Sequence, residues 1–120
     1  MLTEIESFVN WLRRRNPPAR TWRDYRTDLF QFAAVTGDGP PGTVTFRDVD
    51  HFVAAQTNKG FQPSTVNRRL AAITAFYTFL ADEDPTLVCP VLPHRHNLRE
   101  RQRLPRPVQE DELARFFAVI

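Results

Sequence analysis

The sequence is nearly devoid of cysteine and contains no long run of apolar residues. Its single cysteine, Cys89, excludes a framework of internal disulfides and is compatible with a reducing cytoplasm. No apolar run approaches the length of a membrane-spanning helix, and the first residues lack the pattern of a signal peptide. We therefore expect a cytoplasmic protein without a membrane partner.

The motifs that mark many enzymes are also missing. The sequence contains no glycine-rich phosphate loop. It also lacks Ser, His and Asp residues in an order that would suggest a hydrolase. Cys89, His94 and His96 lie close together, but the spacing C-x4-H-x-H lacks the paired ligands and the fourth partner of a zinc site. The sequence thus predicts neither a metal nor a cofactor.

What the sequence does contain is a supply of large apolar groups in a short chain. Its 120 residues include ten Phe and two Trp, which is enough for one domain with a modest core. No stretch sustains the period-two alternation of a strand, whereas apolar residues recur at helical spacing. We therefore predict an all-α fold, namely a compact four-helix bundle.

Helix-capping residues mark the ends of these helices. Thr3 with Glu6 is typical of a capping box at the start of the first helix, and Thr45 with Asp48 of a cap on the third. Gly60 can supply the left-handed residue that ends the third helix. The predicted helices cover about residues 3–15, 20–35, 45–58 and 63–81, with a Gly/Pro-rich loop at 37–42.

The second and fourth helices each have one apolar side. Pro63 fits the first position of the fourth helix, where its missing N–H costs nothing. Asp28 of the second helix is expected to pair with neighbouring arginines. The buried stripes consist of Trp22, Tyr25, Leu29 and Phe32 in the second helix, and of Val66, Leu70, Ile73, Tyr77 and Leu80 in the fourth.

Positive charge is almost entirely arginine and is unevenly distributed. Lys59 is the only lysine among sixteen basic residues, and the net charge is +2. Residues 13–26 hold six arginines against Asp24 alone, and residues 94–107 hold five against Glu100 alone. This segregation predicts a basic surface on a nearly neutral body. Within it, residues 13–15 suit either compensation of a helix dipole or contact with DNA.

The character of the chain changes after Pro85. Prolines bracket the arginine-rich run, which predicts an extended basic linker rather than a packed element. Helical spacing of apolar residues then returns and predicts a short C-terminal helix whose apolar face has nothing after it, so we expect the front part of a longer protein. The predicted divisions are 1–88 for the helical domain, 89–107 for the linker and 108–120 for the start of a further domain.

Three motifs carry a family resemblance. They are Thr21-x-x-x-Tyr25-x-x-Asp28-Leu29-x-x-Phe32, Ser64-Thr65-Val66-Asn67-Arg68-Arg69-Leu70, and Leu104-Pro105-Arg106-Pro107-Val108 with Asp111-Glu112-Leu113. In this order and spacing the chain resembles the N-terminal core-binding (SAM-like) domain of tyrosine recombinases, or phage-type integrases, including the Xer-like branch. The likeness spans nearly all 120 residues.

The resemblance implies that the second and fourth helices lie against the major groove of a recombination site in double-stranded DNA. It also implies other recombinase protomers as partners in a synaptic complex, and a linker that lies near the DNA backbone. Arg69, beside the apolar stripe, can instead be a salt-bridge partner. The expected DNA contacts are Arg20, Thr21, Arg23, Arg26, Lys59, Ser64, Asn67, Arg68, Arg95, Arg99, Arg101 and Arg103.

The family's catalytic residues belong to a C-terminal domain, of which residues 108–120 resemble only the entry. The chain is therefore expected to bind DNA in integration or recombination without being an enzyme itself, while its parent is a tyrosine recombinase. Tyr25 and Tyr77 fall on buried stripes and are expected in the core. A helical protein–protein interaction module without a nucleic-acid role remains the alternative, and integration, excision and dimer resolution remain equally open for the parent.

Overall fold

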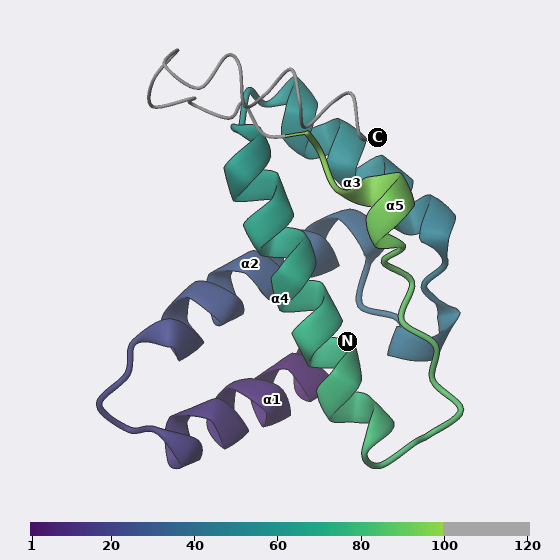
Figure 1. Cartoon of the computed structure of the whole chain (residues 1–120). Coiled ribbons are helices and arrows are strands. Elements are labelled where there is room, and N and C mark those ends of the chain that lie inside the picture. Colours follow the sequence, from purple (N-terminus) through teal and green to yellow (C-terminus); the bar gives the residue numbers. More distant parts are fainter. Residues whose placement is uncertain (100–120) are drawn as a thin grey trace, which may run out of the picture.

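The computed structural model describes residues 1–99, and all regular structure in that range is helical (Figure 1). This confirms the predicted all-α SAM-like bundle. The predicted C-terminal helix lies outside the described residues. The elements are α1 (Leu2–Arg15), α2 (Thr21–Thr36), the 3-10 turn η1 (Pro41–Thr43), α3 (Phe46–Asn58), α4 (Pro63–Ala81) and α5 (Pro93–His96).

The central element is α4, and α1, α2 and α3 all pack against it (Figure 1). Its predicted apolar stripe is buried from Val66 to Leu80, and Phe76 beside that stripe is buried completely. Burying each large apolar side chain contributes about 1.5–3 kcal/mol. Pro63 occupies the first turn of α4, as predicted.

An aromatic cluster holds α1 against α2 and α4. The ring centroid of Phe8 in α1 lies 5.9 Å from that of Tyr25 in α2. It also lies 5.8 Å from Phe76 and 5.3 Å from Phe79, both in α4. These tilted ring pairs add about 0.5–1.5 kcal/mol each beyond the apolar area they bury. Because α1 and α2 share this anchor, their arginine-rich ends stay close together across the short connection.

Tyr77 connects α4 to the loop between α2 and α3. Its side chain is 2% exposed, and its hydroxyl donates a hydrogen bond of 2.7 Å to the carbonyl of Pro41. Burial raises the pKa of the Tyr77 phenol well above its ordinary value. Pro41 begins η1, so the loop predicted without helix contains one short 3-10 turn. The expected core position of Tyr77 is confirmed.

Of the three helix ends predicted from capping residues, two are confirmed and one is wrong. The backbone N–H of Thr45 donates to Asp48 at 2.8 Å in a capping box, and Gly60 has a left-handed φ of 88°. The capping box predicted at Thr3 is wrong, because α1 begins one residue earlier and Thr3 lies inside it. The N–H of Leu2 instead donates to Asp38 at 2.8 Å, from a loop far along the sequence.

The segment after Pro85 runs back along the bundle and ends in α5, which packs on α3 (Figure 1). Pro90, Val91 and His96 are buried. The expectation of a linker without packed contacts is therefore corrected for residues 89–99, because polar side chains of α3 and α4 bind this segment. Within residues 1–99, no helix combines the length and the apolar content needed to cross a membrane.

Candidate nucleic-acid interface

The first turns of α4 present both polar groups and positive charge. Lys59 and Ser64 are exposed, and the side chain of Arg68 is 55% exposed. Arg68 and Arg69 are neighbours in sequence but point to different surroundings, since Arg69 is only 9% exposed. Only one of the two arginines can therefore reach a ligand in solvent.

A buried carboxylate of α2 binds both of these arginines. Asp28 is 1% exposed and accepts hydrogen bonds from Arg68 Nη2 at 2.9 Å and Arg68 Nε at 3.3 Å. The same Asp28 accepts a hydrogen bond of 3.3 Å from Arg69 Nε. The expectation that Asp28 pairs with arginines of its own helix is therefore wrong, because its partners come from α4. Its ion pairs join α2 to α4 where the two helices pack.

Arg69 is buried and has several partners inside the protein. Its Nη1 donates to the side-chain oxygen of Gln56, and its guanidinium lies 4.3 Å from the ring centroid of Phe61. Both contacts stabilise a buried positive charge that Asp28 neutralises. The interpretation of Arg69 as a salt-bridge partner is thus confirmed.

Asn67 binds the predicted linker at Leu98. Its side-chain nitrogen donates to the Leu98 carbonyl at 2.8 Å, and its side-chain oxygen accepts the Leu98 N–H at 2.7 Å. Both functions of the amide are therefore used by one backbone position. A base contact by Asn67 requires this pair to open or to share its atoms.

Asp50 of α3 holds α5 in place. Arg95 donates to its two carboxylate oxygens from Nε at 3.0 Å and from Nη2 at 2.7 Å. The pKa of Asp50 lies below its ordinary value, chiefly because of the hydrogen bond from Arg95 and further because of His96. The guanidinium of Arg95 also lies 4.8 Å from the ring centroid of Phe46.

His96 uses both of its ring nitrogens within the protein. Nδ1 accepts the N–H of Leu92 at 2.9 Å, so Nε2 carries the proton and faces Asp50 Oδ1 at 2.9 Å. With His96 2% exposed, this imidazole anchors α5. No group of three or more His, Cys, Asp or Glu side chains suited to a metal ion occurs in residues 1–99.

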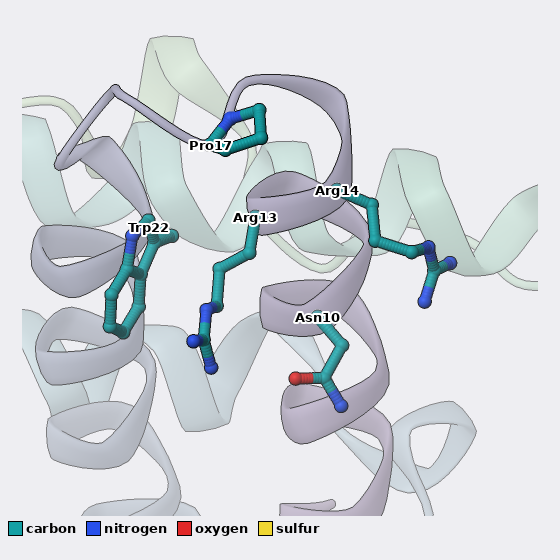
Figure 2. Close-up of a pocket in the computed structure, with 5 residues that line it drawn as sticks. All are labelled: Asn10, Arg13, Arg14, Pro17 and Trp22. Atoms are coloured by element: carbon teal, nitrogen blue, oxygen red, sulfur yellow. The ribbon is translucent and has the colours of Figure 1, made fainter.

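The facing ends of α1 and α2 form a basic groove of about 530 Å³ (Figure 2). The guanidinium of Arg13 lies 4.6 Å from the ring centroid of Trp22, and that of Arg23 lies 5.4 Å from the same ring. In Figure 2 the side chain of Arg13 points toward Trp22, whereas Arg14 extends away from it. Arg20, at the start of α2, is exposed. Two arginines thus lie over one aromatic ring that is partly exposed to solvent.

Comparison with known proteins decides the family. The family model for the phage integrase N-terminal SAM-like domain matches residues 4–84. The chain belongs to this family. The matched range contains all four long helices except the first residues of α1.

Individual relatives extend the match along most of the chain. The chain is similar to Tyrosine recombinase XerC of Pelotomaculum thermopropionicum, with 33% identity over 121 residues that cover 93% of this chain and 39% of that protein. It is also similar to the XerC proteins of Chlorobaculum tepidum (30% over 125 residues, 93% and 36% covered) and Staphylococcus carnosus (29% over 118 residues, 96% and 40% covered). The chain thus spans about two fifths of the length of these relatives. No solved structure matches the chain significantly.

Within residues 1–99 of this phage integrase domain, the predicted contact residues fall into two groups, those whose side chains are exposed without an ion pair and those that bind a partner in the protein. Arg20, Thr21, Arg23, Lys59, Ser64 and Arg99 are exposed side chains without an ion pair inside residues 1–99. Arg26 donates to Glu6 at 3.2 Å, and Asn67, Arg68 and Arg95 have the partners described above. Arg101 and Arg103 lie outside the described residues.

Sequence reasoning missed the integrase domain's two carboxylate anchors, Asp28 and Asp50. A signal for Asp28 was present, because it lies three residues after Tyr25 and four before Phe32, on the apolar side of its helix. A carboxylate at such a position needs a buried partner. No comparable local signal marks Asp50, whose partners lie 45 and 46 residues away.

Proposed function

We propose that this chain is the DNA-binding N-terminal portion of a tyrosine site-specific recombinase and that it grips a recombination half-site in double-stranded DNA. The observation that carries the proposal is the set of exposed basic side chains on α2 and α4 in a domain of the phage integrase family. Exposed arginines and a lysine neutralise phosphates, and each neutralised phosphate releases counterions from the duplex.

The proposed surface consists of the beginnings of α2 and α4. Arg20, Thr21 and Arg23 supply it from α2, and Ser64 and Arg68 supply it from α4. A hydroxyl at the first turn of a helix suits a phosphate oxygen, and arginine suits both phosphates and guanine. Lys59 lies just before α4 and adds to the same positive end.

The remaining predicted contacts are either paired within the protein or belong to the linker. Arg26 and Arg95 are paired with Glu6 and Asp50, so a phosphate has to compete with these carboxylates. Arg99, Arg101 and Arg103 remain proposed backbone contacts of the linker, and 89–107 remains the proposed interdomain linker.

Recombination itself is proposed for the longer polypeptide. The relatives are named tyrosine recombinases, and this chain spans about two fifths of their length. We assign strand cleavage to a catalytic domain of which residues 108–120 form only the start. Other protomers of the same recombinase are the proposed protein partners in a synaptic complex.

Salt-dependent binding to duplex DNA tests the proposal. A fluorescently labelled 30-base-pair duplex of mixed sequence is titrated with the chain between about 50 and 200 mM NaCl, and binding is followed by anisotropy. The logarithm of the association constant should fall linearly with the logarithm of salt concentration, by about 0.9 per neutralised phosphate. Absence of binding at the lowest salt concentration would contradict the proposal and favour a protein-interaction module.

Two charge reversals near the starts of two helices locate the surface. Arg20→Glu changes the residue that precedes α2, and Arg47→Glu changes the second residue of α3. A glutamate is favourable at either helix start, so neither change should unfold the domain. We expect Arg20→Glu to reduce the salt slope by about 0.9 and to weaken binding about tenfold, whereas Arg47→Glu weakens it at most about twofold. Equal effects of the two variants would mean that α2 does not form the interface.

A further inference from the structure

Where α2 and α4 pack together, the buried carboxylate of Asp28 binds the exposed guanidinium of Arg68. Asp28 is 1% exposed, and its carboxylate cannot turn toward solvent because Arg69 holds it from the interior at 3.3 Å. Arg68 is bound to the same carboxylate from the outside, through Nη2 at 2.9 Å and Nε at 3.3 Å. An arginine held by two bonds to a fixed acceptor has little rotational freedom left.

The two bonds leave one edge of the Arg68 guanidinium available. A guanidinium has five N–H donors, of which Asp28 takes the one on Nε and one on Nη2. No hydrogen bond within residues 1–99 uses Nη1 of Arg68, and the side chain is 55% exposed. The open Nη1–Nη2 edge is a planar fork, which matches the N7 and O6 acceptors of guanine.

The surroundings of Arg68 on α4 allow a base edge to come close. Ser64, one helical turn before Arg68, is small and exposed, so no large side chain shields the fork on that side. Arg69 cannot compete for the same ligand, since Asp28, Gln56 and the Phe61 ring occupy it. A phosphate contact depends mainly on positive charge, whereas the two parallel bonds from one guanidinium to guanine N7 and O6 depend on the orientation of its plane.

We propose that Asp28 is a positioning residue that fixes the Arg68 guanidinium, so that its free Nη1–Nη2 edge reads a guanine in the major groove of the bound DNA. The inference rests on the proposed DNA-binding function and adds a source of sequence specificity to it. Asp28 itself does not touch DNA. Asp28 therefore affects the base preference of the domain and leaves its non-specific affinity for the phosphate backbone unchanged.

Selection from a randomised duplex library tests this inference. The full 120-residue chain, wild type and variants, is incubated with duplexes carrying a random central segment, and the bound fraction is sequenced. Wild type should enrich a motif that includes a guanine. In Arg68→Lys, which keeps the charge but lacks the fork, and in Asp28→Asn, the preference for that guanine should fall about tenfold or more, since a good bidentate pair discriminates about 5- to 150-fold.

The affinity for a mixed-sequence duplex is the readout that a purely structural role would change. We expect Asp28→Asn to bind this duplex at least as tightly as wild type, because a negative charge has been removed. Asp50→Asn is the matched control, since it makes the same charge change at a carboxylate that also binds an arginine, and it should leave the guanine preference intact. A parallel loss of affinity for all duplexes in Asp28→Asn, with unchanged base preference, would overturn the inference.

A measurement on the wild-type chain keeps the test independent of the folding of Asp28→Asn. The Nε–H of Arg68 should give a nitrogen relaxation signal as ordered as the backbone, whereas that of the exposed Arg99 should be mobile. Equal mobility of the two would overturn the inference. If wild type binds DNA but enriches no guanine, only this inference fails; if it binds no duplex at low salt, the proposed function fails together with it.

Discussion

Asn67 and the backbone of Leu98 exchange two hydrogen bonds, of 2.8 and 2.7 Å, across 31 positions of sequence. An amide side chain that pairs with both polar atoms of one residue acts like a neighbouring strand for that residue. Together with the Asp50 pairs of α5, this contact fastens the chain to the helical body as far as Leu98. Leu98 is therefore held in place by side chains of α3 and α4.

Removing the Asn67 amide should loosen this attachment. In Asn67→Ala both hydrogen bonds to Leu98 are lost, and each contributes about 0.5–1.5 kcal/mol net. We expect the Leu98 amide hydrogen to exchange with solvent about tenfold faster or more, as measured by NMR, with little change at buried amides of α4. Asn58→Ala, which changes an exposed asparagine at the end of α3, is the control and should leave Leu98 protected. Equal protection of Leu98 in both variants would show that Asn67 does not hold it.

Acid should release α5 through Asp50. Because the pKa of Asp50 is lowered in the folded protein, chiefly by the hydrogen bond from Arg95, its contribution is present above the ordinary pKa of aspartate. That contribution is lost as the pH falls through the lowered pKa, that is, below about pH 4. The amide chemical shifts of Leu92 and His96 should change together in this range. In Asp50→Asn the acid transition at these two amides should be absent, whereas Asp82→Asn should retain it.

The hydroxyl of Tyr77 should contribute to stability at neutral pH and limit it at alkaline pH. Tyr77→Phe removes the 2.7 Å hydrogen bond to the Pro41 carbonyl, which still accepts the N–H of Val44 at 3.3 Å. The free energy of unfolding should therefore fall by about 0.5–1.5 kcal/mol, the net contribution of one hydrogen bond. For a domain of this size that lowers the melting temperature by roughly 4–8 °C per kcal/mol. Thermal unfolding followed by circular dichroism measures it, and an unchanged melting temperature would contradict the assigned bond.

The raised pKa of Tyr77 adds a pH dependence to the same comparison. Burial disfavours the ionised phenol, so the contribution of Tyr77 is complete below the ordinary pKa of tyrosine and is lost as the pH rises through the raised one. The advantage of wild type over Tyr77→Phe should therefore shrink above about pH 10. Melting temperatures of the two proteins at pH 8 and pH 11 provide the test.

Arg13 distinguishes the two roles open to the arginines at the end of α1. Arg13→Gln removes a charge that faces Trp22 at 4.6 Å and lies in the last turn of the helix. If the groove binds phosphate, the salt slope of duplex binding should decrease by about 0.9. Compensation of the helix dipole alone would lower stability by about 0.3–1 kcal/mol and leave the slope unchanged. Titration and thermal unfolding of the same variant separate these outcomes.

Features that depend on near neighbours were determined by the sequence itself. The period of Val66, Leu70, Ile73 and Tyr77 places them on one side of a helix whatever that helix packs against, and they are buried. The cap formed by Thr45 and Asp48 also follows from a spacing of three residues. Such interactions lie within one helical turn and can be evaluated without knowing the fold.

Partners far apart in sequence were decided only by the tertiary structure. Asp28 was expected to pair within its own helix, but the packing of α2 on α4 places two arginines 40 and 41 positions away against it. The start of α1 is capped by Asp38 rather than by Thr3, because the loop after α2 returns to that helix. Whether an arginine is buried, as Arg69 is, or exposed, as Arg68 is, depends on the angle between helices, and no residue pattern within a single helix encodes that angle.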